Sequence, residues 1–68
     1  MTKLEIGDRI ELDHMPDDPR PIEPGDRGTI NRIEEAAYGL PLCYGVLWDS
    51  GRTLKVIVGK DLFRKIAQ

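Results

Sequence analysis

Few side chains of this chain could take part in catalysis or bind a metal. Two of them, both carboxylates, are adjacent in the sequence and follow Pro16. Asp17 and Asp18 are adjacent carboxylates, and paired carboxylates can share a proton or hold a cation when the backbone places them across a cleft. Neighbouring side chains of an extended loop point apart, however. Their position between two prolines predicts instead that they form turns through hydrogen bonds to the local backbone.

A nucleophilic site would need a serine or a cysteine beside a base. His14 follows Asp13, which could orient it, and the candidate nucleophiles are Ser50 and Cys43, but no spacing brings either one close to His14. The single histidine and single cysteine also provide no zinc set of the usual type and no internal disulfide. We therefore expect no enzyme, no metal site and no cofactor.

Length and composition predict one small domain over residues 1–68. The chain has 68 residues, of which 40% are hydrophobic and 32% charged, which suits a folded domain with a thin core. It has no run of about 18 apolar residues that could cross a membrane, and its first residues lack the apolar segment of a secretion signal. We expect a cytoplasmic protein without a membrane partner.

Five short segments separated by turn signals are predicted as strands, at 8–12, 29–33, 43–48, 52–58 and 63–66. Four prolines between Asp13 and Gly25 exclude a helix or a central strand there and predict a stiff acidic loop. Ile30 and Ile33 are three residues apart, which predicts a bulge. A three-residue hairpin loop is expected at 49–51 and a short turn or 3₁₀ segment before the last strand. These elements favour a small five-stranded all-β barrel.

Several segments of the chain resemble a known family. They are residues 7–10, 15–19, 24–30, 48–54 and 63–66, with Pro24-Gly25-Asp26-Arg27-Gly28-Thr29 and Trp48-Asp49-Ser50-Gly51 as the most specific elements. Together they resemble a family of small uncharacterised bacterial and phage domains. The resemblance implies an SH3-like barrel and no particular activity, and related patterns occur in KOW domains of ribosomal and transcription-elongation proteins. Family members have a shorter second hairpin, so residues 35–42 look like an extension.

The extension could begin with a helical turn, although a hairpin loop is our preferred interpretation. It contains three large apolar residues, Tyr38, Leu40 and Leu42, which is more than the tip of a loop needs. They could bind a protein or a second copy of the chain, or they could fold back and close one end of the barrel. Met15 and Ile22 of the proline-rich loop are predicted to belong to the same protein-binding surface.

Trp48 has the same parity as Val46 and stands just before a turn, which predicts a core or rim residue. The alternative is an aromatic pocket for a peptide or a methylated lysine. A partner could also add a strand to an exposed edge of the sheet.

The basic residues offer a different function. Arg27, Arg32, Arg52 and Lys55 could form a stripe for the phosphates of a nucleic acid, as in a KOW-type accessory domain. Alternatively they form a solvated face paired with acidic residues such as Glu11, Asp49 and Asp61. Ten basic residues stand against twelve acidic ones, and the net charge of -2 disfavours sequence-independent nucleic-acid binding. The sequence therefore predicts a non-enzymatic SH3-like module for another protein or for self-association, with nucleic-acid binding as the alternative and simple dimerisation as a third possibility.

Overall fold

The computed structural model describes residues 4–16 and 18–66, and every regular element within them is a β-strand. The strands are β1 (Arg9–His14), β2 (Arg27–Glu34), β3 (Cys43–Trp48), β4 (Val56–Ile57) and β5 (Leu62–Ile66). They form one antiparallel sheet in the order β4-β3-β2-β1-β5. The prediction of a five-stranded all-β fold is confirmed. The described part of the chain also contains no helix that could cross a membrane.

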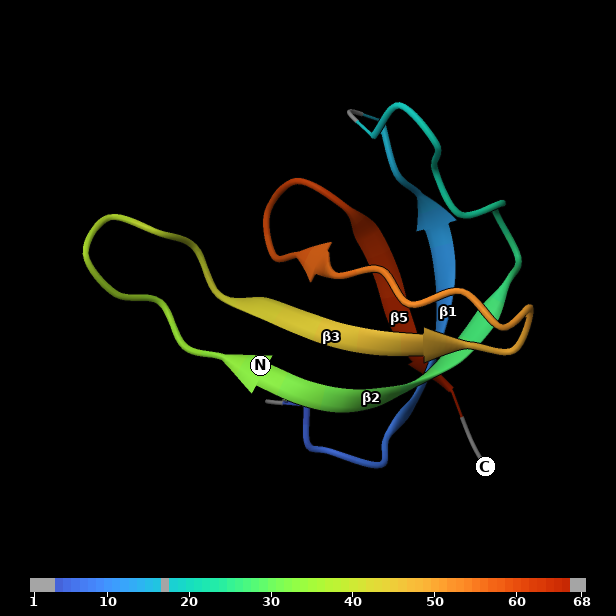
Figure 1. Ribbon diagram of the computed structural model, residues 1–68, viewed down its shortest axis with the longest axis horizontal. Coiled ribbons are helices and arrows are strands. Elements are labelled where there is room, and N and C mark those ends of the chain that lie inside the picture. The colour runs from blue at the N-terminus through green and yellow to red at the C-terminus, as the bar shows by residue number, and fades with distance from the viewer. Residues whose placement is uncertain (1–3, 17, 67–68) are drawn as a thin grey trace.

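The sheet is bent so that its two halves face each other. In Figure 1, β1 and β5 run across β2 and β3 and lie behind them. The core fills the space between the halves and consists of Leu4, Ile10, Leu12, Met15, Ile22, Ile30, Tyr44, Val46, Trp48 and Val56. Within the described residues, no ladder joins β4 to β5, which are the two ends of the sheet. The sheet is thus open, and its closure into a barrel stays a prediction.

Two features of β2 favour this bend. The register between β2 and β3 shifts between Ile30 and Arg32, which confirms the predicted bulge. Gly28 lies against Val46 so closely that a Cβ atom there would be 2.5 Å from the Val46 Cγ1 atom. Because only glycine permits this approach, the type of residue at position 28 helps to set the distance between the two strands.

The proline-rich loop ends in a type II turn that is bonded to β1. Gly25 has a φ of 92°, which this turn requires of the residue after Pro24. The Asp26 N–H donates to the Glu23 carbonyl at 3.0 Å, and the Gly25 N–H donates to the Leu12 carbonyl at 2.8 Å. The turn predicted from Pro24-Gly25-Asp26 is confirmed.

The fourth strand is shorter than the predicted 52–58, although the residues before it stay in register with β3. Val56 pairs with β3 within β4, and Thr53 pairs with β3 in the same register as an isolated bridge. Between these two points, the Leu54 carbonyl accepts the indole N–H of Trp48 at 3.1 Å. The Leu54 N–H still donates to the Val46 carbonyl at 3.3 Å, and the regular strand consists of two residues.

A tight turn precedes β5, as predicted. Gly59 has a φ of 92°, and the Asp61 N–H donates to the Ile57 carbonyl at 2.9 Å. The Asp61 carboxylate is buried and accepts the Ile57 N–H at 2.8 Å. Asp61 therefore closes the turn through both its backbone and its side chain.

Residues 35–42 form a hairpin and not a helical turn. Ala37 and Leu40 exchange two backbone hydrogen bonds, of 3.2 and 2.8 Å, across the tip. The two residues between them, Tyr38 and Gly39, have φ angles of 51° and 79°. Positive φ at both central positions defines a type I′ turn, whose twist matches that of the flanking strands. The hairpin interpretation is confirmed.

Candidate binding site

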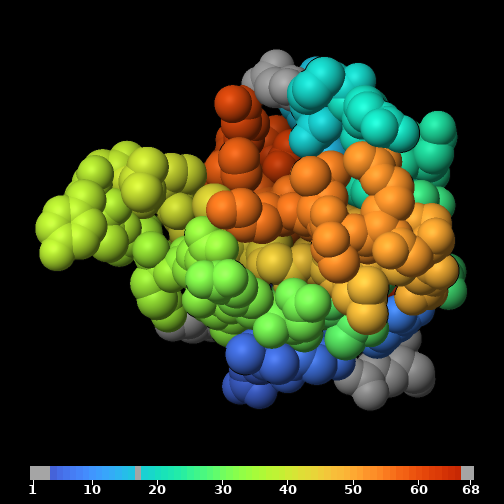
Figure 2. Space-filling view, in the orientation of Figure 1, coloured from blue at the N-terminus to red at the C-terminus, as the bar shows by residue number. Residues whose placement is uncertain are grey.

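The hairpin carries two large apolar side chains away from the body of the domain. Figure 2 shows residues 35–41 projecting beyond the compact mass formed by the rest of the chain. Tyr38 is 103% exposed and Leu40 is 69% exposed. Since the turn continues β2 and β3 outward, neither side chain reaches the core. For these two residues the lid interpretation is wrong.

Leu42 differs from the other two apolar residues of the extension. Its side chain is half-buried and packs against the core, and its carbonyl accepts the Val58 N–H at 3.0 Å. It fixes the base of the hairpin to the segment that follows β4. The projecting tip is therefore supported by a packed residue, and the surface available to a partner consists of Tyr38 and Leu40.

Met15 and Ile22 do not belong to that surface. Met15 is 5% exposed and Ile22 is 2% exposed, and both are members of the core. Arg52 holds the loop between them in place, because its guanidinium donates to the carbonyls of Arg20 at 2.8 Å and of Pro21 at 3.3 Å. The prediction that these two apolar residues face a partner is corrected, since packing under the loop accounts for their hydrophobicity.

The four predicted phosphate-binding residues do not form one stripe. Arg27 lies on β2 and pairs with Glu11 at 3.0 Å, whereas Arg52 is engaged by backbone carbonyls of the loop. Only Arg32 and Lys55 are brought together, on either side of Glu34. Each of the four thus contacts an acceptor within the domain, which agrees with the interpretation of a solvated, paired face.

Two carboxylates organise the charges on the other side of the sheet. Glu11 on β1 stands opposite arginines of both neighbouring strands, and hydrogen bonds from Arg64 and then Arg27 hold the pKa of its carboxyl below the ordinary value. Asp49 receives both terminal nitrogens of Arg9, at 2.7 and 2.6 Å, and this pairing lowers the pKa of its carboxyl. The cross-strand contacts of Glu11 tie β1 to β2 and β5, and the bidentate pair ties β1 to the turn after β3.

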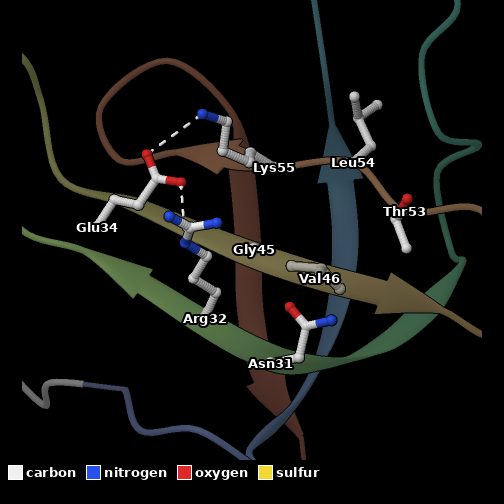
Figure 3. Close-up of a pocket in the computed structure, with 8 residues that line it drawn as sticks. All are labelled: Asn31, Arg32, Glu34, Gly45, Val46, Thr53, Leu54 and Lys55. Carbon is white, nitrogen blue, oxygen red and sulfur yellow. Dashed lines mark hydrogen bonds and ion pairs between the residues drawn. The ribbon is translucent and has the colours of Figure 1, made fainter.

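A pocket of about 270 Å³ opens where the β3–β4 ladder is interrupted. Figure 3 shows its lining side chains on β2, on β3 and on the segment before β4; they are Asn31, Arg32, Glu34, Gly45, Val46, Thr53, Leu54 and Lys55. Arg32 Nε lies 3.5 Å from one oxygen of Glu34, and Lys55 Nζ lies 3.2 Å from the other. One end of the pocket is therefore lined by two cations that share a single carboxylate.

Gly45 forms the floor of this pocket. A Cβ atom at this position would lie 2.9 Å from the Arg32 Cβ and 3.1 Å from the Asn31 Oδ1 atom. The hollow thus exists because β3 has no side chain where the bulge of β2 turns Asn31 and Arg32 toward it. The predicted bulge was the sequence signal for this site, but the spacing alone did not reveal which residues face the bulge.

The residues considered for catalysis are not assembled. Cys43 begins β3 and Ser50 follows the end of the same strand, while His14 ends β1 and pairs with β5. Asp18 accepts the Arg20 N–H at 2.8 Å, which confirms its turn-forming role, and Asp17 lies outside the described residues. Residues 4–16 and 18–66 contain no group of three or more potential metal ligands.

Comparison with known families gives one match that covers nearly the whole chain. The model of a domain of unknown function, DUF4314, matches residues 2–66. The chain belongs to this family. No curated protein and no solved structure matches the chain. Membership in the DUF4314 family agrees with the resemblance to an uncharacterised domain family and carries no activity with it.

Proposed function

We propose that this domain is a non-enzymatic binding module of SH3-like type that docks on another protein through the tip of its second hairpin. The observation that carries the proposal is the complete exposure of Tyr38 at a turn position that tyrosine disfavours. A non-glycine residue in the left-handed region costs roughly 1 to 2 kcal/mol. Strained positions of this kind concentrate at functional sites, so the outlier supports a role for the ring outside the fold.

The chemistry of the tip suits a protein partner. Burial of a leucine side chain such as that of Leu40 contributes about 1.5 to 3 kcal/mol, and tyrosine is enriched among the residues that dominate protein interfaces. The two-residue turn between Ala37 and Leu40 is closed by two hydrogen bonds, so the tip loses little conformational entropy on binding. A second copy of the chain could supply the partner surface, and dimerisation is then the function of the tip.

Nucleic-acid binding of KOW type is the alternative from a different class, and the geometry gives it less support. Phosphate binding requires cations that exchange their counterions for phosphates. Arg27 and Lys55 already face carboxylates, and Arg52 is committed to the proline-rich loop. A nucleic acid would compete with these carboxylates and carbonyls for the cations, on a chain of net charge -2.

Site-specific photo-crosslinking tests the tip directly. A photo-reactive phenylalanine analogue at position 38 is compared with the same analogue at Ile6, which is also exposed, at 66%, but lies in a different part of the chain. We expect a discrete protein adduct from position 38, either heteromeric or dimeric, that disappears when Leu40 is replaced by serine. Sedimentation of the wild type and of the Tyr38→Ser/Leu40→Ser variant separates self-association from binding to another protein.

The outcomes of these experiments distinguish protein binding from nucleic-acid binding. Equal crosslinking from positions 38 and 6, with no self-association, would contradict the proposal. Binding of a short oligonucleotide that falls steeply with salt and is lost on replacing Arg32 and Lys55 by glutamine would move nucleic-acid binding to first place.

A further inference from the structure

The pocket over Gly45 has the size of one amino-acid residue. Its volume is about 270 Å³. Pockets for small molecules occupy roughly 300 to 1,000 Å³, so this one lies just below their range. It has room for a single side chain together with its backbone group.

The charges at one end of the pocket favour an anion. Arg32 and Lys55 supply two positive charges, and Glu34 between them supplies one negative charge. The local sum of +1 is matched by one carboxylate. A phosphate is attracted by the same two cations, but it has no apolar part to lie against Leu54, which also lines the pocket.

The cations retain donors for a ligand. Arg32 reaches Glu34 through Nε at 3.5 Å, and its guanidinium has four further N–H groups on the terminal nitrogens. Lys55 contacts Glu34 through an ammonium that can donate three hydrogen bonds. In Figure 3 both groups lie at the same end of the pocket, with Glu34 between them, and the amide of Asn31 lies beside the floor. A carboxylate placed there would be bound by charge-assisted hydrogen bonds.

The rest of the lining offers a different surface. Leu54 is half-buried and packs against the core, and Gly45 presents only backbone. A ligand that spans the pocket would therefore have an anionic end near Arg32 and a small apolar part near Leu54. The free end of a polypeptide chain has this combination, with its α-carboxylate next to the last side chain.

We propose that this pocket captures the C-terminal residue of a partner protein, with its α-carboxylate between Arg32 and Lys55 and its side chain over Gly45 and against Leu54. This inference rests on the proposed protein-binding function and names the part of the partner that is recognised. The pocket lies at the base of the hairpin, since Glu34 ends β2 where the extension begins. One partner can therefore occupy the pocket and contact Tyr38.

Titration with a minimal probe tests the pocket. N-acetyl-L-alanine carries the free carboxylate and a small side chain, and N-acetyl-L-alanine amide has the same shape without the charge. Both are added at constant ionic strength while the amide NMR shifts of the labelled domain are recorded, together with the fluorescence of Trp48, whose indole is bonded to Leu54. We expect saturable shifts at Gly45 and Lys55 with the acid only. Inorganic phosphate is expected to bind more weakly than the acid.

Variants of the two cations sharpen the test. Hydrogen bonds to charged groups contribute about 1.5 to 3 kcal/mol, so Arg32→Gln or Lys55→Gln should each weaken binding of the acid about tenfold or more. Lys65→Gln is the matched control, because Lys65 is also exposed and ion-paired but lies on β5. Equal binding of the amide, stronger binding of phosphate, or no loss in the two variants would overturn the proposal.

The failure of this proposal can be told apart from the failure of the proposed function. Tyr38→Ser/Leu40→Ser should leave binding of N-acetyl-L-alanine unchanged, because neither residue lines the pocket. If the pocket does not bind the acid while position 38 still gives a specific adduct, only the C-terminal capture is wrong. If the acid binds and position 38 gives no adduct, the pocket is a binding site and the proposed role of the hairpin tip is wrong.

Discussion

Replacing Tyr38 by asparagine should make the domain more stable. The ring of Tyr38 is fully exposed and contributes no packing, while its backbone has a φ of 51°. Asparagine is favoured at the first central position of a type I′ turn, and it enters the left-handed region more readily than other residues with a side chain. Since the left-handed region costs an ordinary residue roughly 1 to 2 kcal/mol, Tyr38→Asn should raise the free energy of unfolding by about 1 kcal/mol.

Thermal unfolding measures this gain. For a domain of 60 to 100 residues, 1 kcal/mol corresponds to a shift in Tm of about 4 to 8 °C. Tyr38→Ala is the matched control, because it removes the same ring but keeps a residue that disfavours positive φ. We expect the asparagine variant to unfold several degrees above both the alanine variant and the wild type. Gly39→Ala, at a φ of 79° with open space around the added Cβ, should be destabilised through the backbone alone.

Equal Tm values for the asparagine and alanine variants would refute the argument from backbone conformation. A loss of stability in both variants would show that the ring packs on the domain in solution. If the stabilised Tyr38→Asn variant also fails to bind the partner that crosslinking identifies, stability and binding oppose each other at this residue. Such an opposition is expected where a strained position is retained for function.

Three further predictions concern the core and the charges. Trp48→Ala should lower the free energy of unfolding by about 3 to 5 kcal/mol, because it leaves a cavity and removes the hydrogen-bond donor to the Leu54 carbonyl. Chemical denaturation should show that this small domain has lost most of its stability. Gly28→Ala should cost about 1 to 3 kcal/mol by overpacking against Val46, whereas a change below 0.5 kcal/mol would show that β2 and β3 can move apart. The lowered pKa of Glu11 contributes stability that is fully present above the ordinary pKa of 4.5 and is lost as the pH falls through the pKa of the folded state. Glu11→Gln should therefore flatten the acid side of the profile of stability against pH. An unchanged profile would contradict the role of this carboxyl.

Local sequence patterns identified the strands and turns because their causes are local. The third strand was predicted at its observed bounds, since alternation around Val46 and Trp48 reflects one buried face. Gly51 has a φ of 96° and its N–H donates to the Trp48 carbonyl at 2.9 Å, as the Asp-Ser-Gly turn predicted. The bulge in β2 followed from the irregular spacing of its isoleucines. These features depend on the φ preferences and the side-chain parity of neighbouring residues.

The candidate site was predicted only in part, because exposure depends on how the sheet bends. Tyr38 and Leu40 were singled out from composition, yet the same pattern allowed a lid. Met15 and Ile22 were assigned to a surface because they stand in the predicted stiff, proline-rich loop, whereas both side chains pack in the core. The pocket was missed, since its lining joins the bulge of β2 to a segment more than twenty residues later.

By itself, the sequence determined the all-β class, the strand periodicity, the tight turns and the apolar content of the extension, because these follow from interactions between near neighbours in the chain. Only the tertiary structure decided that the hairpin points outward, that the arginines are committed to Glu11 and to the loop, and that Gly45 lies under Arg32. Those outcomes depend on contacts between residues far apart in the chain, and no local pattern specifies which distant groups the bent sheet brings together.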